Sequence, residues 1–242
     1  MNCLICGTSP TIKSHLIPKS MAQEVQVGKA HAVAMNPNSY VYTQSGVFER
    51  EILCVGCDNK LGGFENIAIK AFRNIRQDAK GESYRECTLK GVAGDDILRF
   101  AAGVLWKYSV ASEKNGRVAL GPYKQVLEDI VFHNKPIPSS VDAILFRLKT
   151  HDADDGVFAY RLPSPDRQEL VNGYRLLVGG MFIFIKLDKQ SPQNGALQRG
   201  SIRGNPDLRY TVMPAQNFEE YKRADELAHS GQLSSFLDKQ DV

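Results

Sequence analysis

Two Cys-x-x-Cys pairs constrain this chain more than any other feature of its sequence. Cys3-Leu-Ile-Cys6 lies at the start of the chain, and Cys54-Val-Gly-Cys57 follows after 47 intervening residues. Each pair offers two sulfur atoms from one tight turn, and two pairs complete the tetrahedral set that a structural zinc ion requires. The alternative is four ordinary buried cysteines, because free cysteine is a common core residue. The paired spacing of four of the five cysteines favours zinc, and leaves Cys87 as a plain thiol.

The expected location of the protein bears on the state of these thiols. The first residues contain no basic segment followed by an apolar run, so no secretory signal is expected. The longest apolar stretch, around residues 176–187, is interrupted by Gly179 and Gly180 and is too short to span a membrane. We therefore expect a cytoplasmic protein without membrane contact, in a reducing compartment that favours metal binding over disulfides.

Positive charge is concentrated at the N-terminal end. The whole chain has a formal net charge of +3, and residues 1–80 hold nine Lys and Arg against six Asp and Glu. The remaining residues balance at 21 of each sign, so the first 80 residues account for the entire excess. A modestly basic surface permits contact with nucleic-acid phosphates but does not by itself establish it.

The first 80 residues have the order of elements of a treble-clef zinc fold. The first cysteine pair is followed by a short strand or turn ending near Pro18, a polar loop over residues 28–46 and a predicted strand over 47–53. The second pair leads into a helix over about residues 58–77, in which apolar residues recur at helical spacing. A polar and basic stripe occupies another side of this helix, made of Asn59, Asn66, Lys70, Arg73 and Gln77.

The rest of the chain predicts an α+β domain with helices and an antiparallel sheet. Residues 81–93 are typical of a linker, so we expect one domain over residues 1–80 and a second over residues 90–242. Helices are expected at about 95–108 and 122–132, and Asn217-x-x-Glu220 predicts the capped start of a last helix. Strands are expected at 143–149, 157–162, 169–171, 174–178 and 181–187, with tight turns at Asn172-Gly173 and Gly179-Gly180.

The cysteine pairs and the segment between them resemble the HNH, or His-Me finger, endonuclease family with a structural zinc. That family has two knuckles, an Asp-His-hydrophobic-hydrophobic-Pro segment between them, and a Leu-Cys-x-x-Cys segment that opens a helix. Here these segments read Ser14-His15-Leu-Ile-Pro18 and Leu53-Cys-Val-Gly-Cys-Asp58. The resemblance covers residues 1–75 and implies a ββα-metal, HNH-like module that hydrolyses phosphodiester bonds.

The resemblance also implies roles for individual residues. His15 matches the family's general base, Asp58 matches the metal-ligand position after the last cysteine, with Asn59 beside it, and Lys60 approximates the family's lysine. Ser14 stands where many members carry an aspartate that helps to hold the catalytic ion. The family's middle asparagine, which orients the histidine, has only Asn36 and Asn38 as candidates here, from their place in the loop.

Several of these residues have a second interpretation. His15 is either the base that activates water, or an additional histidine around the zinc or in a hydrogen bond that shapes the turn before Pro18. Glu65 lies seven residues after Asp58 on nearly the same side of the helix. It is a second metal ligand, a solvated helix acid or an acid paired with Arg76. Lys60, Lys70 and Arg73 are candidate nucleic-acid contacts, although such a stripe is more often a solvated helix face.

The sequence therefore favours a metal-dependent, HNH-like endonuclease acting on nucleic acid, with DNA as the expected substrate. Its zinc would be structural, and Mg²⁺ or Mn²⁺ would serve at a catalytic site of His15, Asp58, Asn59 and Glu65. A protein partner or a second copy of the chain would contact residues 90–242. The alternative is a non-catalytic treble-clef protein that binds nucleic acid or another protein.

Overall fold

The structure is a computed structural model of an α+β protein, in which a cluster of four cysteines precedes a six-stranded mixed sheet with helices. The expected α+β class is confirmed at this level. The described residues are 1–26, 31–36, 39–78, 84–150, 157–193 and 195–231.

Two very short strands bring the first cysteine pair close to the second. Strand β1 (Ser14–His15) pairs antiparallel with β4 (Phe48–Glu49), and helix α1 (Lys19–Gln23) follows β1. The predicted strand over 47–53 is thus largely wrong, because only Phe48 and Glu49 within it form a regular pair. The carbonyls of Ile52 and Leu53 instead accept hydrogen bonds from the N–H groups of Leu4 and Ile12, which holds the first knuckle beside the second.

A hairpin replaces part of the loop expected over residues 28–46. Strand β2 (His31–Asn36) pairs antiparallel with β3 (Ser39–Thr43). The polar residues around this segment suggested a loop, but the short runs His-Ala-Val-Ala-Met and Ser-Tyr-Val-Tyr-Thr contain the β-branched and aromatic residues that favour strands.

The long helix expected after the second knuckle is confirmed. Helix α2 (Val55–Asp78) begins three residues earlier than predicted, because the N–H of Asp58 donates to the carbonyl of Cys54 and makes the knuckle part of the first turn. Its apolar side is buried, as the 3.6-residue period requires. The buried side chains are Leu61, Ala68, Ala71, Phe72 and Ile75.

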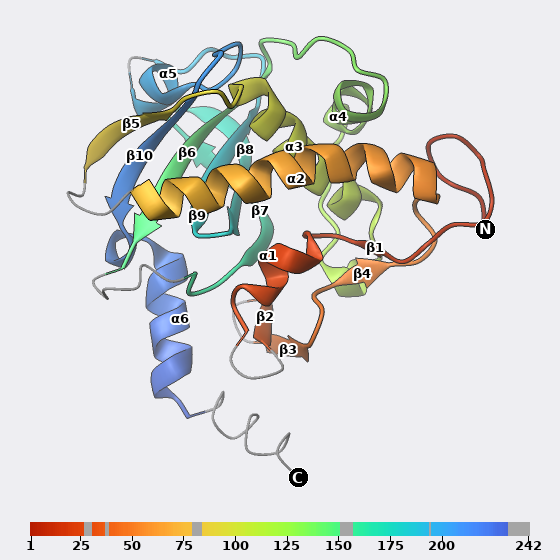
Figure 1. Ribbon diagram of the computed structural model, residues 1–242, viewed down its shortest axis with the longest axis horizontal. Coiled ribbons are helices and arrows are strands. Elements are labelled where there is room, and N and C mark those ends of the chain that lie inside the picture. The colour runs from red at the N-terminus through yellow and green to blue at the C-terminus, as the bar shows by residue number, and fades with distance from the viewer. Residues whose placement is uncertain (27–30, 37–38, 79–83, 151–156, 194, 232–242) are drawn as a thin grey trace.

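Two further helices pack against α2, both close to their predicted positions, and the first of them also contacts the sheet. Helix α3 (Gly94–Val110) contacts α2, α4 (Tyr123–Phe132) and the sheet. Edge-to-face rings join these helices, with Phe72 and Phe100 5.8 Å apart and Trp106 and Phe132 4.8 Å apart between ring centres. Figure 1 shows α2 lying across the molecule, with β1 and β4 near its N-terminal end.

The main sheet has six strands in the order β5–β10–β6–β9–β8–β7. All neighbours pair antiparallel except β10 and β6, which are parallel, so the expected antiparallel sheet is in fact mixed. Strand β5 lies within the segment expected to be a linker, where it pairs with β10 at the sheet edge. The strands are β5 (Arg85–Leu89), β6 (Val141–Lys149), β7 (Arg161–Gln168), β8 (Val171–Val178), β9 (Met181–Leu187) and β10 (Leu208–Pro214).

One of the two predicted tight turns lies elsewhere. Gly179 and Gly180 turn between β8 and β9 with positive φ, as predicted. The turn expected at Asn172-Gly173 instead falls at Glu169 and Leu170, whose φ angles are 48° and 66°. Gly173 lies inside β8. Only glycine fits there, because a Cβ would come within 2.3 Å of the carbonyl oxygen of Ile185. This glycine therefore serves close strand approach, not chain reversal.

The two faces of the sheet are covered differently. One face packs under α2 and α3, and its core is continuous with Cys3, Leu16 and Leu53 of the N-terminal part. The other face is covered by α5 (Ala196–Gly200), the 3-10 helix η2 (Ala215–Asn217) and neighbouring residues. The proposed boundary between residues 80 and 90 stays a prediction, but the interior is shared across it.

The last helix, α6 (Glu219–His229), projects from the end of the molecule opposite β1 and β4 (Figure 1). Its expected Asn217–Glu220 cap is not formed. Phe218 holds the cap position, the Asn217 side chain donates to the Tyr84 hydroxyl, and Glu220 is buried in an ion pair with Arg161 at 2.7 Å. Among the described residues, no helix is long and apolar enough to cross a membrane.

Candidate metal centre and histidine site

The four paired cysteines converge on one point. The sulfur atoms of Cys3, Cys6, Cys54 and Cys57 all lie within 4.8 Å of one another, and the Cys6 sulfur is 3.6 Å from those of both Cys54 and Cys57. In a tetrahedral zinc site with bonds of about 2.3 Å, sulfur atoms lie about 3.8 Å apart. The donor set and its spacing therefore fit a closed, four-sulfur zinc site.

The close approach of four thiols also affects their ionisation. Burial and the neighbouring sulfur atoms raise the pKa of Cys57, whereas hydrogen bonding with the side chain and backbone of Thr8 lowers the pKa of Cys6 to about 6. Cys57 resists ionisation because its charge would be buried close to other sulfur atoms. A bound divalent cation removes that penalty, since metal-bound cysteines are deprotonated.

The pairing of β1 with β4 sorts the residues next to the metal centre onto two sides. Ser14 lies opposite Glu49, and His15 lies opposite Phe48. Successive side chains of a strand point to opposite faces, so each pair of residues occupies its own side of the β1–β4 pair. Ser14 is fully buried, and Glu49 accepts hydrogen bonds from Ser112 on the segment after α3. The His15 and Phe48 rings lie together on the other side, with their centres 6.0 Å apart.

Asp58 lies in the first turn of α2, directly after the last cysteine. The Ser14 hydroxyl donates to its carboxylate over 2.6 Å. The structure thus brings together the two positions that the HNH resemblance assigns to metal ligands, although one of them is a serine here. Sequence reasoning noted the substitution at Ser14 but did not foresee this hydrogen bond.

His15 is half-buried beside several cations. Burial lowers the pKa of its imidazole, and the positive charges of Lys13, Lys107 and Lys19 lower it further, while Asp58 acts in the opposite direction. The ring is therefore neutral near pH 7, which is the form that accepts a proton. Its Nε2 atom is buried and has no hydrogen-bond partner within the described part of the chain.

Glu65 is joined to this site through a buried lysine. The ammonium group of Lys107, on α3, donates to the Glu65 carboxylate over 2.7 Å and to the backbone carbonyl of His15 over 2.6 Å. The suggested pair of Glu65 with Arg76 is not formed, because Arg76 contacts Glu24 and the carbonyl of Gly179 instead. Lys107 was missed, yet it is the only charged residue between Phe100 and Tyr108, and a lone charge in a buried helix needs a partner.

The candidate nucleic-acid residues on α2 differ in their surroundings. Asn59 and Lys70 are exposed. The Lys60 ammonium donates to the carbonyl of Phe132 over 3.4 Å, and Arg73 forms an ion pair with Glu24 at 2.8 Å. Lys70 is thus the most available cation of the predicted stripe.

No second metal centre is formed by the described residues. The four cysteines are the one group of three or more Cys, His, Asp or Glu residues there whose ligand atoms lie close enough to share an ion. Asp58 and Glu65 do not belong to such a group. Of the two candidates for the middle asparagine, Asn38 and the side chain of Asn36 lie outside what the structure describes.

Comparison with known proteins returns no relative. No protein-family model, no curated protein and no solved structure matches this chain. The likeness to HNH endonucleases therefore rests on the motifs of residues 1–75 alone.

Proposed function

We propose that this protein is a metal-dependent, HNH-like endonuclease that hydrolyses phosphodiester bonds in nucleic acid, with DNA as the expected substrate. One observation carries the proposal: Asp58 directly follows a four-cysteine cluster whose spacing fits a structural zinc ion, and its charge acts on the pKa of His15. The zinc site is closed by four sulfurs, so it serves to hold the knuckles and not to bind substrate.

In this mechanism, His15 removes a proton from the attacking water. A neutral imidazole suits this step, and the cations around His15 favour the neutral form. Asp58, the Ser14 hydroxyl and Asn59 would hold Mg²⁺ or Mn²⁺, an ion that stabilises negative charge on the phosphate and the leaving oxygen when bound.

Glu65 receives a different role from the one its helix position suggested. Its carboxylate is ion-paired with Lys107, and the same ammonium group holds the backbone carbonyl of His15. We therefore assign Glu65 and Lys107 to positioning the His15 strand against α3, and not to binding the catalytic ion.

A second candidate function has specific support. Asp58 is hydrogen-bonded to Ser14, Glu65 is ion-paired, and the His15 Nε2 atom is buried. These features suit a zinc-stabilised module that binds nucleic acid or a protein without cleaving it, in which His15 has a structural role.

Replacement of His15 distinguishes the two functions. His15→Ala is expected to reduce cleavage by about 100- to 10,000-fold, the usual cost of losing a general base, while zinc content and the unfolding midpoint stay close to wild type. The measurement uses supercoiled plasmid, single-stranded DNA and RNA, each with added Mg²⁺ or Mn²⁺.

The matched control is His133→Ala, because His133 is an exposed histidine at the end of α4. It should cleave like wild type. A wild-type protein inactive on every substrate, or a His15→Ala variant as active as wild type, would falsify the nuclease and favour the binding module.

A further inference from the structure

Two cations, an imidazole and an aromatic ring lie together on the outer side of the β1–β4 pair. His15 and Phe48 are cross-strand neighbours, Lys13 lies two residues before His15, and Arg50 lies two residues after Phe48. The Lys13 ammonium is 3.8 Å from the centre of the Phe48 ring, and the Arg50 guanidinium carbon is 5.5 Å from it. We refer to Lys13, His15, Phe48 and Arg50 as the hairpin surface.

The two outer cations of this surface are available to a ligand. Lys13 and Arg50 are exposed, and neither forms an ion pair with any residue that the structure describes. Exposed Lys19, on α1, acts on the same histidine. By contrast, Arg73 on α2 is ion-paired with Glu24. Unpaired positive charge thus lies closer to the histidine than sequence analysis of α2 suggested.

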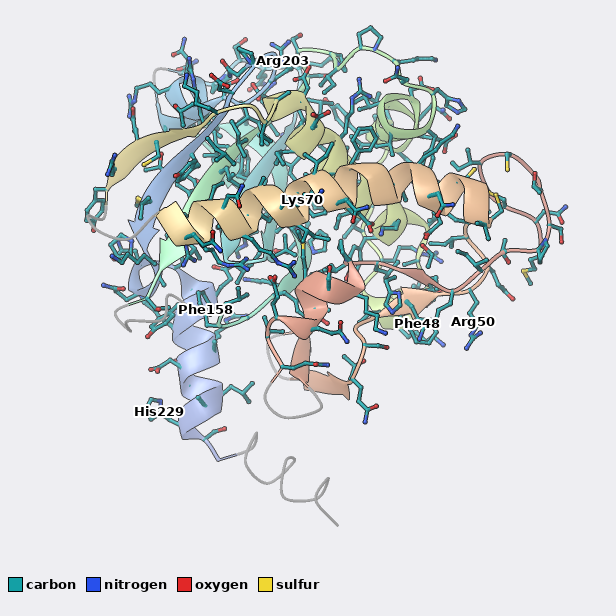
Figure 2. The ribbon with its side chains drawn as sticks, in the orientation of Figure 1. Phe48, Arg50, Lys70, Phe158, Arg203 and His229 are labelled. Atoms are coloured by element: carbon teal, nitrogen blue, oxygen red, sulfur yellow. The ribbon has the colours of Figure 1, made fainter. Side chains whose placement is uncertain are left out.

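An aromatic ring between the two cations adds a second kind of contact. Phe48 is partly exposed, and Figure 2 shows it beside Arg50 at the edge of the molecule, away from Lys70 on α2. Aromatic rings bind unpaired bases by stacking, whereas a duplex keeps its bases inside. Cations hold the phosphates that flank a stacked base. A cation–ring–cation row suits a strand whose bases are free to turn outward.

We propose that the hairpin surface binds single-stranded nucleic acid, with Phe48 stacking on a base and Lys13 and Arg50 contacting the adjacent phosphates. The proposal rests on the nuclease or nucleic-acid-binding function above and specifies its substrate: an unpaired strand next to His15. Lys13 leaves the ring to contact a phosphate when a base takes its place. Single-stranded DNA and RNA share this chemistry, so both are tested.

The test measures binding of fluorescent 12-residue oligothymidine, 12-residue oligouridine and a 12-base-pair duplex, without added divalent ions so that no cleavage occurs. The full-length protein should bind single strands more tightly than the duplex. Phe48→Leu should weaken single-strand binding by about 5-fold or more, since stacking on one aromatic ring contributes about 1–3 kcal/mol per base. Phe158→Leu is the matched control, on a distant part of the molecule (Figure 2).

The two cations are tested through the salt dependence of binding. Lys13→Gln and Arg50→Gln should each reduce the slope of log affinity against log salt by about 0.7, the value for one phosphate contact on a single strand. Arg203→Gln, an exposed arginine elsewhere (Figure 2), should leave the slope unchanged, and Lys70→Gln shows whether α2 contributes. These exposed positions keep the proposal testable if Phe48→Leu disturbs folding.

Three outcomes overturn the proposal: tighter binding of the duplex, unchanged binding by Phe48→Leu with an intact fold, or unchanged salt slopes for both Lys13→Gln and Arg50→Gln. Its failure is distinguishable from failure of the nuclease. A protein that cleaves through His15 but binds independently of Phe48 supports the nuclease and shows that the hairpin surface does not bind the strand. A protein that binds single strands through Phe48 but cleaves nothing supports the hairpin surface and contradicts the nuclease. Preference for oligothymidine or oligouridine identifies the strand as DNA or RNA.

Discussion

Adjacent residues of β1 take part in two different sets of interactions. Ser14 points inward and donates to Asp58, while His15 lies on the other side with Phe48. A shift of one residue in the pairing of β1 with β4 would exchange these two sides. The hydrogen bonds of Glu49 with Ser112 and Asn115 help to prevent such a shift, because they tie β4 to the segment after α3.

Lys107 is the residue whose loss should disturb this arrangement most. Lys107→Met leaves the Glu65 carboxylate and the His15 carbonyl without their shared donor. Breaking one side of a buried ion pair commonly costs about 3 kcal/mol, so the free energy of unfolding should fall by about that amount in urea titrations. Cleavage should fall too, because the His15 strand loses its anchor on α3.

The control for this prediction is Lys124→Met, since Lys124 is exposed on α4 and should change stability by less than about 0.5 kcal/mol. Removing both partners with Lys107→Met and Glu65→Leu should cost less than the sum of the single changes. Equal effects of Lys107→Met and Lys124→Met would show that the buried ammonium does not support the site.

The pKa of His15 sets a second prediction at this scale. Burial and then Lys13 lower that pKa below the ordinary value of 6.5, so the neutral form persists to lower pH. The acid limb of the pH profile of kcat/KM should therefore lie below pH 6.5, and Lys13→Gln should move it upward. Lys70→Gln should not move it. An acid limb above pH 6.5 would contradict the assignment of His15 as the base.

The lowered pKa of His15 also predicts how the stability of the fold changes with pH, which can be measured without an activity assay. The unfolded chain binds a proton at His15 more readily than the folded chain does, because the folded pKa is the lower one. The contribution of His15 to stability is therefore present above pH 6.5 and is lost as the pH falls from there through the folded pKa. Wild type should lose more stability than His15→Gln over that range.

At this scale the sequence predicted only part of the candidate site. The spacing of the cysteines was enough to group them, because two close pairs of soft ligands have few other uses. The contacts of Ser14 with Asp58 and of Lys107 with Glu65 join residues 44 and 42 positions apart. Such pairs depend on how the chain folds back, which no local pattern of residues specifies.

Among the elements, the two cysteine knuckles depend most on a group outside the chain. The purified protein should contain one zinc ion per chain, and replacing Cys54 and Cys57 with serine should remove it. The N-terminal part should then unfold, because no shared cation joins the first knuckle to the second. Elemental analysis and circular dichroism with and without a chelator provide the measurement.

Cys87→Ser is the control for zinc loss, since Cys87 lies on β5, outside the cluster. It should keep both zinc and fold. A wild-type protein that contains no zinc, or that unfolds at the same urea concentration after Cys54 and Cys57 are replaced, would remove the basis of the metal centre.

Helices could be predicted from the sequence more reliably than strands. In α2, α3 and α4, apolar residues recur at helical spacing because one side of each helix is buried, and this pattern is visible within a short stretch of sequence. Strand β5 was missed because its residues, Arg-Glu-Cys-Thr-Leu, lie at an edge and are mostly polar. The parallel pair of β10 with β6 was missed because such pairing joins distant segments. Asn172-Gly173 had the composition of a turn, but close packing against β9 keeps it extended.

Across the whole molecule, one hydrophobic cluster runs from the knuckles to the sheet. It includes Leu16 and Leu53 near the β1–β4 pair, Phe72 on α2, Trp106 on α3 and Ile183 on β9. The residues beneath the hairpin surface therefore share one core with the helices and the main sheet. Substitutions in the sheet that weaken the packing of α3 are expected to displace His15 as well. The link is Lys107, a buried residue of α3 that donates a hydrogen bond to the His15 carbonyl.

This shared interior bears on how such a protein is inherited. A domain with its own hydrophobic core can be moved between genes, because the separated domain still keeps its apolar side chains away from water. Recombination between residues 80 and 90 of this chain would leave Phe72 and Ile75 exposed in one product and Ile97 and Leu98 in the other. We expect descendants of this gene to keep both parts together, and the zinc knuckles to diverge in step with the helices that cover them.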